Sequence, residues 1–253
     1  MTHRPRTYAL AVGLLTVLAA SASPAVDGVI EINQARAANG GVTPGDAPGF
    51  PVTISTGTFA ADPMSFRLTG PLFTSTTGNM IEVLSPHVTI DLNGFGIICL
   101  LSSCSGTGIM SSEINVSVAN GSVRGFATGV SLSGNGSVIE HVRATGGAIG
   151  LSAGNVCAIR SCEANGNSND GIRAGNGCLV SGNTATNNGG DGISTGAGSN
   201  VLGNTILGNT AFGLNLASGT GYSQNVVNGN GGGSVSLGVP AGNNVCNGTT
   251  TCP

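Results

Sequence analysis

Two aspartates and one arginine are of the types, and at the spacing, that could bind a cation or take part in acid–base chemistry. Asp170 and Asp191 each directly precede a glycine, stand at equivalent places of two successive repeats, and have Arg173 between them. If the two carboxylates lie close together, their repulsion raises the pKa of one or favours a bound cation such as Ca²⁺. An Asp before a Gly is also ordinary in turns, where its carboxylate bonds nearby amides. The spacing supports both interpretations and leaves open whether these side chains face outward.

A second group of charged residues comes together when segments from successive repeats are placed side by side. Its members are Glu140, Arg143, Arg160 and Glu163. Opposite charges on neighbouring strands favour a register modestly, so we interpret the group as a solvated ion-pair face. His141 falls in a column that we expect inside the protein, and His87 precedes a predicted strand. No Ser-His-Asp arrangement follows from the spacing.

The chain has seven cysteines, which indicate disulfides in an exported protein. The pairs that we expect are Cys99–Cys104, Cys157–Cys178 and Cys246–Cys252. The middle pair occupies equivalent places of successive repeats, and stacked strands about 4.8 Å apart would bring its Cα atoms within disulfide range. Cys162 remains as the free thiol. Even stacked on His141, it would supply too few ligands for a closed zinc site.

A repeat must position all these residues. Glycines recur with a constant period of about 21 residues, a length typical of stacked solenoids, at Gly108, Gly129, Gly150, Gly171, Gly192 and Gly213, and Ser234 takes the seventh place. The residue after each is aliphatic, and short alternating apolar runs between Gly, Asn and Ser predict three short strands and three turns per repeat. Because helical runs are absent from the repeat, the predicted solenoid is a parallel β-helix.

One column of this repeat is rich in asparagine. It reads Asn120, His141, Cys162, Asn183, Asn204, Asn225 and Cys246. An inward Asn at a corner can bond the backbone of its own rung and the Asn of the next rung, which satisfies groups that would otherwise be buried unpaired. We therefore interpret the column as a structural ladder.

The Gly-aliphatic rung starts, the asparagine column and the segment from Asn183 to Ile193 resemble right-handed parallel β-helix repeat proteins with a pectin-lyase-like fold. The resemblance covers roughly residues 80–252 and implies an all-β, single-stranded right-handed solenoid. Polysaccharide lyases of similar fold bind acidic sugars through Ca²⁺ and use a basic residue to abstract a proton. Polygalacturonases of similar fold use clustered aspartates. Neither characteristic motif is present, so no catalytic residue is carried over, and Asp170, Arg173 and Asp191 stay candidates from spacing alone.

The ends of the chain are expected to differ from the repeat. Residues 1–22 have a basic start, an apolar run and a small-residue cleavage site, which predict a secretory signal peptide. Residues 23–79 are expected to form an N-terminal cap and irregular opening turns, with a short capping helix within Val29–Ala38. Residues 80–253 are expected to form the β-helix, with an insert at Cys99–Thr107 and a C-terminal capping loop.

Composition limits the partners. After signal cleavage six Arg would face eleven Asp and Glu, with no basic cluster and no lysine, which argues against nucleic-acid binding. The apolar run near the N-terminus is too short to span a bilayer comfortably. The expected protein is therefore secreted, extracellular or periplasmic, and binds a polysaccharide or cell-envelope component or serves as a structural module. The alternative is a small polysaccharide lyase or glycoside hydrolase, which the uniform rungs and scarce aromatic residues disfavour. The sequence indicates no cofactor besides the Ca²⁺ alternative and leaves the oligomeric state open.

Overall fold

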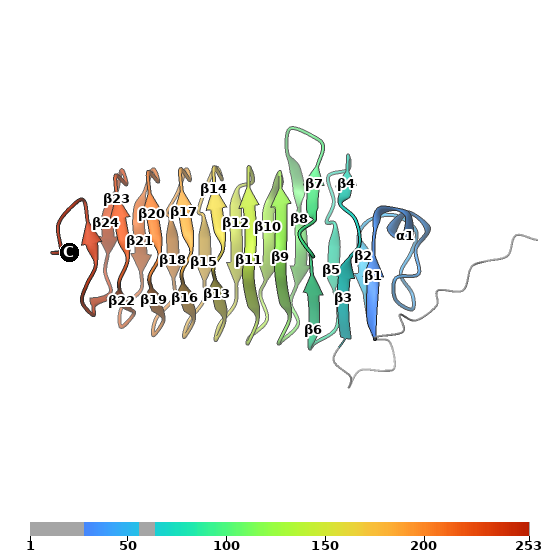
Figure 1. The fold of residues 1–253 in the computed structure, drawn as a ribbon, viewed down its shortest axis with the longest axis horizontal. Coiled ribbons are helices and arrows are strands. Elements are labelled where there is room, and N and C mark those ends of the chain that lie inside the picture. The colour runs from blue at the N-terminus through green and yellow to red at the C-terminus, as the bar shows by residue number, and fades with distance from the viewer. Residues whose placement is uncertain (1–27, 56–63, 253) are drawn as a thin grey trace, which may run out of the picture.

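The computed structural model describes residues 28–55 and 64–252, and the predicted signal peptide lies outside them. These residues wind into an elongated parallel β-helix in which successive rungs stack along one axis (Figure 1). The pairings between successive rungs are parallel throughout the named strands. The predicted all-β solenoid with 21-residue rungs is confirmed.

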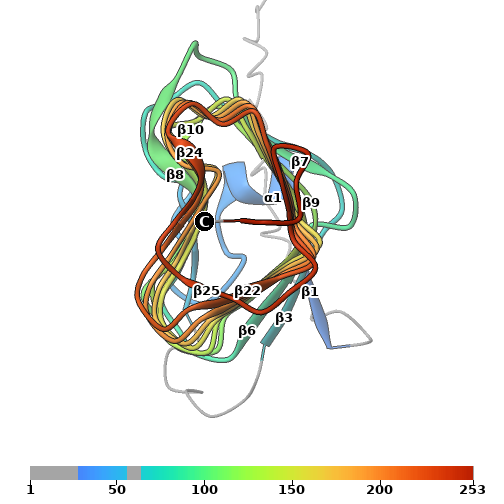
Figure 2. The ribbon, with the colours of Figure 1, turned by 90° about the vertical axis from the view of Figure 1, so that its left-hand side faces the viewer.

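Each rung passes through three walls. Wall 1 is a nine-stranded sheet, and walls 2 and 3 are the two rows of a seventeen-stranded sheet that bends between them (Figure 2). Wall 1 contains β2 (Val52–Ile54), β5 (Ile81–Val83), β8 (Cys104–Ser111), β10 (Phe126–Leu132), β12 (Ile149–Ala153), β15 (Ile172–Ala174), β18 (Ile193–Thr195), β21 (Phe212–Leu216) and β24 (Gly233–Ser236).

The rows of the bent sheet are joined by two long strands, β9 (Ser117–Arg124) and β11 (Val138–Thr145), which run through both. Wall 2 contains β1 (Val29–Ile32), β3 (Met64–Leu68), β6 (Val88–Asp91), β13 (Ala158–Arg160), β16 (Leu179–Ser181), β19 (Asn200–Leu202), β22 (Gly221–Ser223) and β25 (Val239–Pro240). Wall 3 contains β4 (Leu72–Thr74), β7 (Gly96–Cys99), β14 (Glu163–Asn165), β17 (Thr184–Thr186), β20 (Thr205–Leu207), β23 (Val226–Asn228) and β26 (Val245–Cys246).

Corner 1 joins wall 1 to wall 2, corner 2 joins wall 2 to wall 3, and corner 3 leads to the next rung. At each corner a residue with positive φ precedes an inward residue, as Gly182 precedes the buried Asn183. Glycine at the start of wall 1 has a steric reason. A Cβ on Gly171 would lie 2.7 Å from both the Gly192 carbonyl oxygen and the Asn188 Nδ2, so the stacked backbones leave no room for a side chain.

One rung departs from the sequence period. Ile172 pairs with Ile193, a full period further on, but Val138 pairs with Ala158, which falls one residue short of the period. The shift makes Ile139 the inward residue of wall 2 where the period places Val138. It also corrects the expected position of His141, which is exposed at corner 2 with φ 52°, while Val142 points inward.

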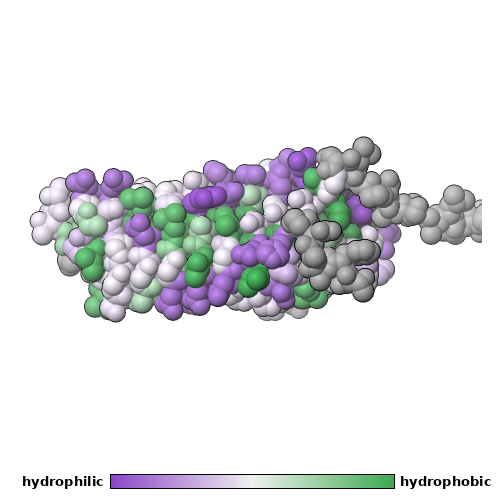
Figure 3. All heavy atoms as spheres, turned by 90° about the horizontal axis from the view of Figure 1, so that it is seen from below, coloured by the Kyte–Doolittle hydropathy of each residue, from purple (hydrophilic) through white to green (hydrophobic). Residues whose placement is uncertain are grey.

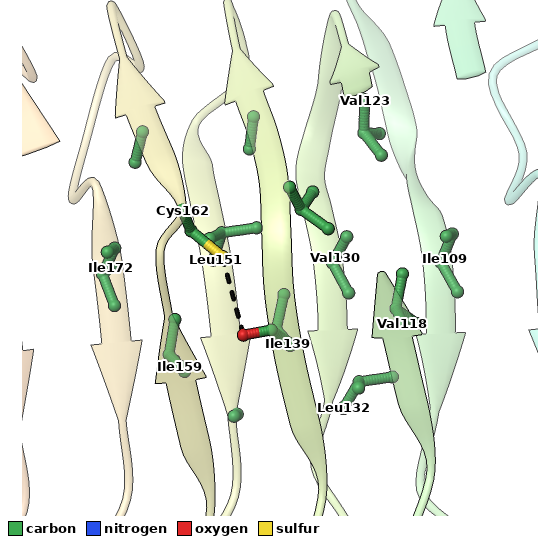
Figure 4. Packing of buried hydrophobic residues seen from close by; sticks show 14 of the residues in the cluster. Ile109, Val118, Val123, Val130, Leu132, Ile139, Leu151, Ile159, Cys162 and Ile172 are labelled. Atoms are coloured by element: carbon green, nitrogen blue, oxygen red, sulfur yellow. Dashed lines mark hydrogen bonds between the residues drawn. The ribbon is translucent and has the colours of Figure 1, made fainter. Parts of the chain in front are cut away.

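The core is a continuous column of aliphatic side chains enclosed by the three walls. Figure 4 shows part of it, with Ile109, Val130 and Leu151 from wall 1 and Val118 and Ile139 from wall 2. These five side chains are fully buried. Burial of so many apolar groups supplies the main driving force for the stack.

The N-terminal end is covered by a strand and a short helix. The prediction of helical structure from Val29 is wrong for the first residues, because Val29–Ile32 forms β1 and pairs with β3. The helix α1 (Gln34–Asn39) begins after Asn33, whose side chain accepts a hydrogen bond from the Arg36 amide. Its Ala37 is buried in the core cluster, which confirms a short capping helix.

Two features interrupt the regular outline. The loop between β7 and β8 projects from corner 3 (Figure 1). Because of this insert, Ile81 pairs with a residue further along the chain, Ile109, than the repeat period would give. The Cys99–Cys104 disulfide closes this loop. At the other end the last segment, held by Cys246–Cys252, lies across the end of the stack (Figure 2).

Candidate functional site

The outer surface of wall 1 carries the residues that sequence singled out. Asp170 is buried at the end of corner 3, and its Oδ1 accepts a hydrogen bond from the Asp191 amide at 2.9 Å. Its Oδ2 accepts a hydrogen bond from Arg173 Nε at 2.5 Å, which forms an ion pair three residues apart in sequence. Both oxygens of Asp170 therefore have partners.

Asp191 repeats this arrangement one rung further along. Its Oδ1 accepts a hydrogen bond from the Phe212 amide at 2.9 Å, and its Oδ2 accepts one from Asn215 Nδ2 at 2.7 Å. The two aspartates thus form a short ladder in which each carboxylate binds the backbone of the following rung. This is the turn chemistry that an Asp before a Gly allows.

Arg173 faces outward from the middle of wall 1. Its side chain is 42% exposed, and it pairs in register with Ser152 on one side and Ser194 on the other. Within the described residues only Nε has a hydrogen-bond partner, so the terminal guanidinium nitrogens point their donors at solvent. The buried Asp170 fixes the fork of the guanidinium, and such a fork suits carboxylate or sulfate groups.

We call Asp170, Arg173, Asp191, Phe212 and Asn215 the Arg173 cluster. Arg173 and Asn215 are two strand spacings apart, or about 10 Å. The half-buried ring of Phe212 adds an apolar surface beside Gly233. The cluster therefore presents a cation and an amide in one row, Arg173 and Asn215, with an aromatic ring in the adjacent column of the two aspartates. The carboxylates bond Arg173 and Asn215 and so hold that row.

The other charged group forms two exposed ion pairs where walls 2 and 3 meet. Arg160 Nε bonds Glu140 at 2.7 Å, and Arg143 Nε bonds Glu163 at 2.7 Å. The hydrogen bond and charge of Glu163 raise the pKa of Arg143 above its ordinary value, so this guanidinium stays charged. The geometry matches the ion-pair face that the sequence suggests.

A shallow hollow of about 500 Å³ lies at corner 2, lined by residues that include His141, Arg143, Glu163 and Thr184. Wall 2 lies at the bottom of Figure 2 and faces the viewer in Figure 3, where hydrophilic and hydrophobic residues are interspersed. The arginine and the carboxylate in this lining are already paired with each other. His87, near the start of the stack, contacts Asn115 Nδ2 at 3.3 Å through its Nδ1.

The cysteines lie as their spacing suggests. Disulfides join Cys99 to Cys104, Cys157 to Cys178, and Cys246 to Cys252, and the Cα atoms of the middle pair are 4.6 Å apart. Cys162 is a buried free thiol. It stacks on Val142 rather than on His141, and its Sγ contacts the carbonyl oxygens of Arg160 and Ile139 (Figure 4). Burial raises the pKa of this thiol to about 11.

Metal ligands do not gather in the part of the chain that the structure describes: no three His, Cys, Asp or Glu side chains there lie close enough to hold an ion together. Each carboxylate oxygen of Asp170 and Asp191 already accepts one hydrogen bond.

The sequence interpretation missed a second asparagine ladder at corner 3. Its members are Asn167, Asn188, Asn209 and Asn230, and each side-chain oxygen accepts the amide of the preceding member. Gly-Asn pairs such as Gly166–Asn167 and Gly208–Asn209 were the available signal, because a positive-φ residue precedes each inward Asn. The interpretation also missed Phe212, which stands in the same column as the two aspartates.

The first ladder differs from its predicted membership. Asn183, Asn204 and Asn225 are buried and linked as predicted, but Asn244 rather than Cys246 accepts the next bonds. Asn120 is exposed at the corner, as is His141. Both ladders serve the fold and leave the surface of wall 1 as the better candidate site.

These features define the class of the protein as a parallel β-helix. No protein-family model and no curated protein matches the sequence. Among solved structures, the Dettilon tailspike protein is similar with a TM-score of 0.52 at 12% identity, over 66% of this chain and 45% of that one.

The periplasmic alginate epimerase AlgG, solved as its T265N mutant, is similar with a TM-score of 0.52 at 15% identity, over 79% of this chain and 55% of that one. This chain spans about half the length of both proteins. At such low identity the likeness establishes the fold alone. Within the described residues, no helix has the length and apolar character needed to cross a membrane.

Proposed function

We propose that the chain is an exported carbohydrate-binding β-helix whose Arg173 cluster holds an acidic polysaccharide. The observation that carries this proposal is the outward guanidinium of Arg173, fixed by the buried Asp170 and open at its terminal nitrogens. A planar fork of this kind binds a carboxylate with two parallel hydrogen bonds. The disulfides agree with an oxidising compartment.

The neighbouring groups suit a sugar chain. Asn215 offers an amide oxygen, Ser152 and Ser194 offer hydroxyls in register with Arg173, and Phe212 offers an apolar face. Sugar rings combine hydroxyl edges with apolar faces, so such mixed surfaces recognise them. The name of one protein with a similar fold, an alginate epimerase, accords with a polysaccharide partner.

Binding is favoured over catalysis because the carboxylates have other partners. A nucleophile or general base needs a free carboxylate within reach of its substrate. Asp170 and Asp191 instead bond the backbone of the next rung through one oxygen and a side chain through the other. A small lyase or hydrolase is therefore the second candidate, in which calcium would bind the remaining lone pairs of these carboxylates.

One experiment separates these functions. The full chain is titrated with polygalacturonate, alginate and a neutral glucan, with and without Ca²⁺, while binding, new reducing ends and unsaturated products are measured together. We expect binding of the acidic polymers without turnover. Arg173→Gln should weaken it about tenfold or more, because a charged hydrogen bond contributes about 1.5–3 kcal/mol.

Arg160→Gln is the matched control, since this arginine lies on wall 2 and is similarly exposed. Equal binding by the Arg173→Gln variant and the unchanged protein would refute the proposed site. Turnover that disappears in Asp170→Asn or Asp191→Asn would replace the binding function with the enzymatic one.

A further inference from the structure

A second hollow lies beside the projecting Cys99–Cys104 loop, at corner 3. It encloses about 570 Å³, within the range of ordinary ligand sites. Its lining includes Thr77, Ser105, Phe126, Ala148 and Ser168. It follows the edge of wall 1 across successive rungs, and the disulfide-closed loop forms one side of it.

The lining of this hollow is polar but uncharged. Hydroxyl groups come from Thr77, Ser103, Ser105 and Ser168, and apolar surface comes from Ala127 and Ala148, whereas the side chain of Phe126 is buried in the core beneath. No Asp, Glu, Lys or Arg is among its lining residues. A charged group that entered would lose part of its water and meet hydroxyl groups but no opposite charge, which is unfavourable. The hollow therefore suits uncharged groups with both hydroxyl and apolar faces.

Two glycines keep the hollow open. Gly146 and Gly166 line it at the positive-φ position of corner 3, with φ of 66° and 65°, and a Cβ on either would meet no heavy atom within 4 Å. The next rung has Asn187 at the equivalent position, with φ 53°. This corner thus tolerates an Asn side chain, and its absence from two successive rungs leaves the space.

The hollow leads to the Arg173 cluster. Its last lining residue, Ser168, is two residues before Asp170 on the same rung. Its amide bonds the Gly147 carbonyl oxygen of the preceding rung at 2.8 Å. From Thr77 to Ser168 the hollow spans four strand spacings, or about 19 Å, which is long enough for several sugar rings.

We propose that this hollow holds uncharged sugar residues of the same polysaccharide whose acidic residue binds Arg173. The inference rests on the proposed function and makes it more specific. The preferred ligand is a chain of mixed character, with a carboxylate at Arg173 and neutral or esterified residues extending toward the Cys99–Cys104 loop. A chain that is acidic at every residue fits the hollow less well.

The test compares fully acidic oligogalacturonates with partly methyl-esterified ones, each in a short and a long fraction, by titration calorimetry. The unchanged protein should bind the long esterified fraction at least about tenfold more tightly than the short one, a difference of about 1.4 kcal/mol. The double variant Gly146→Asn/Gly166→Asn should lose this gain and keep its affinity for the short fraction, since Asn accepts positive φ.

The control is Gly177→Asn/Gly203→Asn, which adds the same side chains at positive-φ positions of corners 1 and 2, where a Cβ likewise meets no atom within 4 Å. This variant should keep the gain. If Gly146→Asn/Gly166→Asn keeps it too, or if length and esterification make no difference, the hollow is not part of the site. Arg173→Gln separates the two proposals, because it should weaken short and long fractions alike, and retained binding there refutes the proposed function.

Discussion

The early and late rungs solve the bend at corner 2 in different ways. In two early rungs the corner position is occupied by Gly121 and Val142, and β9 and β11 run through the bend as continuous strands, unlike the divided β6 and β7 before them. In the later rungs Asn183 and its successors occupy it, and each strand is divided, as β16 from β17.

The difference shows what the asparagine does. Asn204 accepts bonds from the backbone amide and the side-chain amide of Asn183, at 2.9 and 3.0 Å, and donates to the Val180 carbonyl oxygen at 2.9 Å. The side chain thus supplies partners to backbone groups that leave the sheet at the bend. Where Val142 turns the same corner, the backbone ladder itself continues.

The largest expected effect comes from breaking the late corner. Asn204→Leu leaves the Asn183 amide, the Asn183 side-chain amide and the Val180 carbonyl without this partner. Each buried group without a partner costs about 1–3 kcal/mol. With three such groups, we expect a loss of about 3 kcal/mol or more in the free energy of unfolding, measured by urea titration.

Val142→Ala is the comparison at the early corner. Val142 is buried, so the change removes apolar contact but leaves no polar group unpaired, and at about 0.8 kcal/mol per buried methylene it should cost about 2 kcal/mol. An Asn204→Leu variant that loses no more stability than Val142→Ala would contradict the role given to the ladder.

Cys162 stands at the boundary between the two kinds of rung, and its thiol makes that boundary sensitive to pH. Its pKa is raised from 9.0 to about 11 by burial, so the folded state holds the proton more tightly than the unfolded state. Its contribution is complete below pH 9.0 and is lost as the pH rises toward 11, on the order of 2 kcal/mol.

The measurement is the free energy of unfolding of the unchanged protein and of Cys162→Ala across this pH range. The difference between the two should fall with rising pH. A constant difference would show that the thiol is not held neutral by the core.

The smallest effect is expected on the outer surface, away from the corner side chains. Arg160→Gln removes an ion pair with Glu140 whose side chains are 48% and 31% exposed. Such pairs contribute little, and we expect a change within about 0.5 kcal/mol in the same urea titration. A loss comparable to that of Asn204→Leu would mean that register depends on surface charge rather than on the corners.

Much of the fold follows from sequence because one column repeats for a steric reason. A Cβ at Gly150, Gly171, Gly192 or Gly213 would collide with the next rung, so the spacing of these glycines reports the rung length directly. Neighbouring side chains along each strand then face alternately inside and outside, which accounts for the burial of Ile159, Val180 and Tyr222 in the core.

The wrong predictions, such as an inward His141, come from one rung that has one residue more at corner 1 and one residue fewer at corner 3. The turn from Leu132 to Val138 is one residue longer than the turn from Ala153 to Ala158, and a shorter turn at corner 3 compensates. The glycine spacing is unchanged by this exchange, so no gap appears in the sequence. A side chain such as His141 then changes sides, because neighbouring residues of a strand face opposite ways.

The candidate site was only partly predictable. Spacing brought Asp170, Arg173 and Asp191 together, but it could not show that both carboxylates bond amides of the following rung. Phe212 was hidden because a single aromatic in a variable outer column has no periodic signal. The hollow beside the Cys99–Cys104 loop depends on the lack of side chains at Gly146 and Gly166. In a sequence this rich in glycine, two further glycines give no sign of a hollow.

The unbroken 21-residue register of the later rungs gives the molecule a quantised length. Ile172, Ile193 and Leu214 occupy equivalent positions, and the side chains that link rungs connect only nearest neighbours. Excising residues 193–213 would therefore rejoin wall, corner and ladder in phase, keep the Cys157–Cys178 disulfide, and shorten the rod by one strand spacing, about 4.8 Å. An excision that is not a whole number of rungs would place core side chains in water. Changes of length that this fold accepts are thus restricted to whole steps, and the distance that the rod spans can be retuned without redesigning its interior.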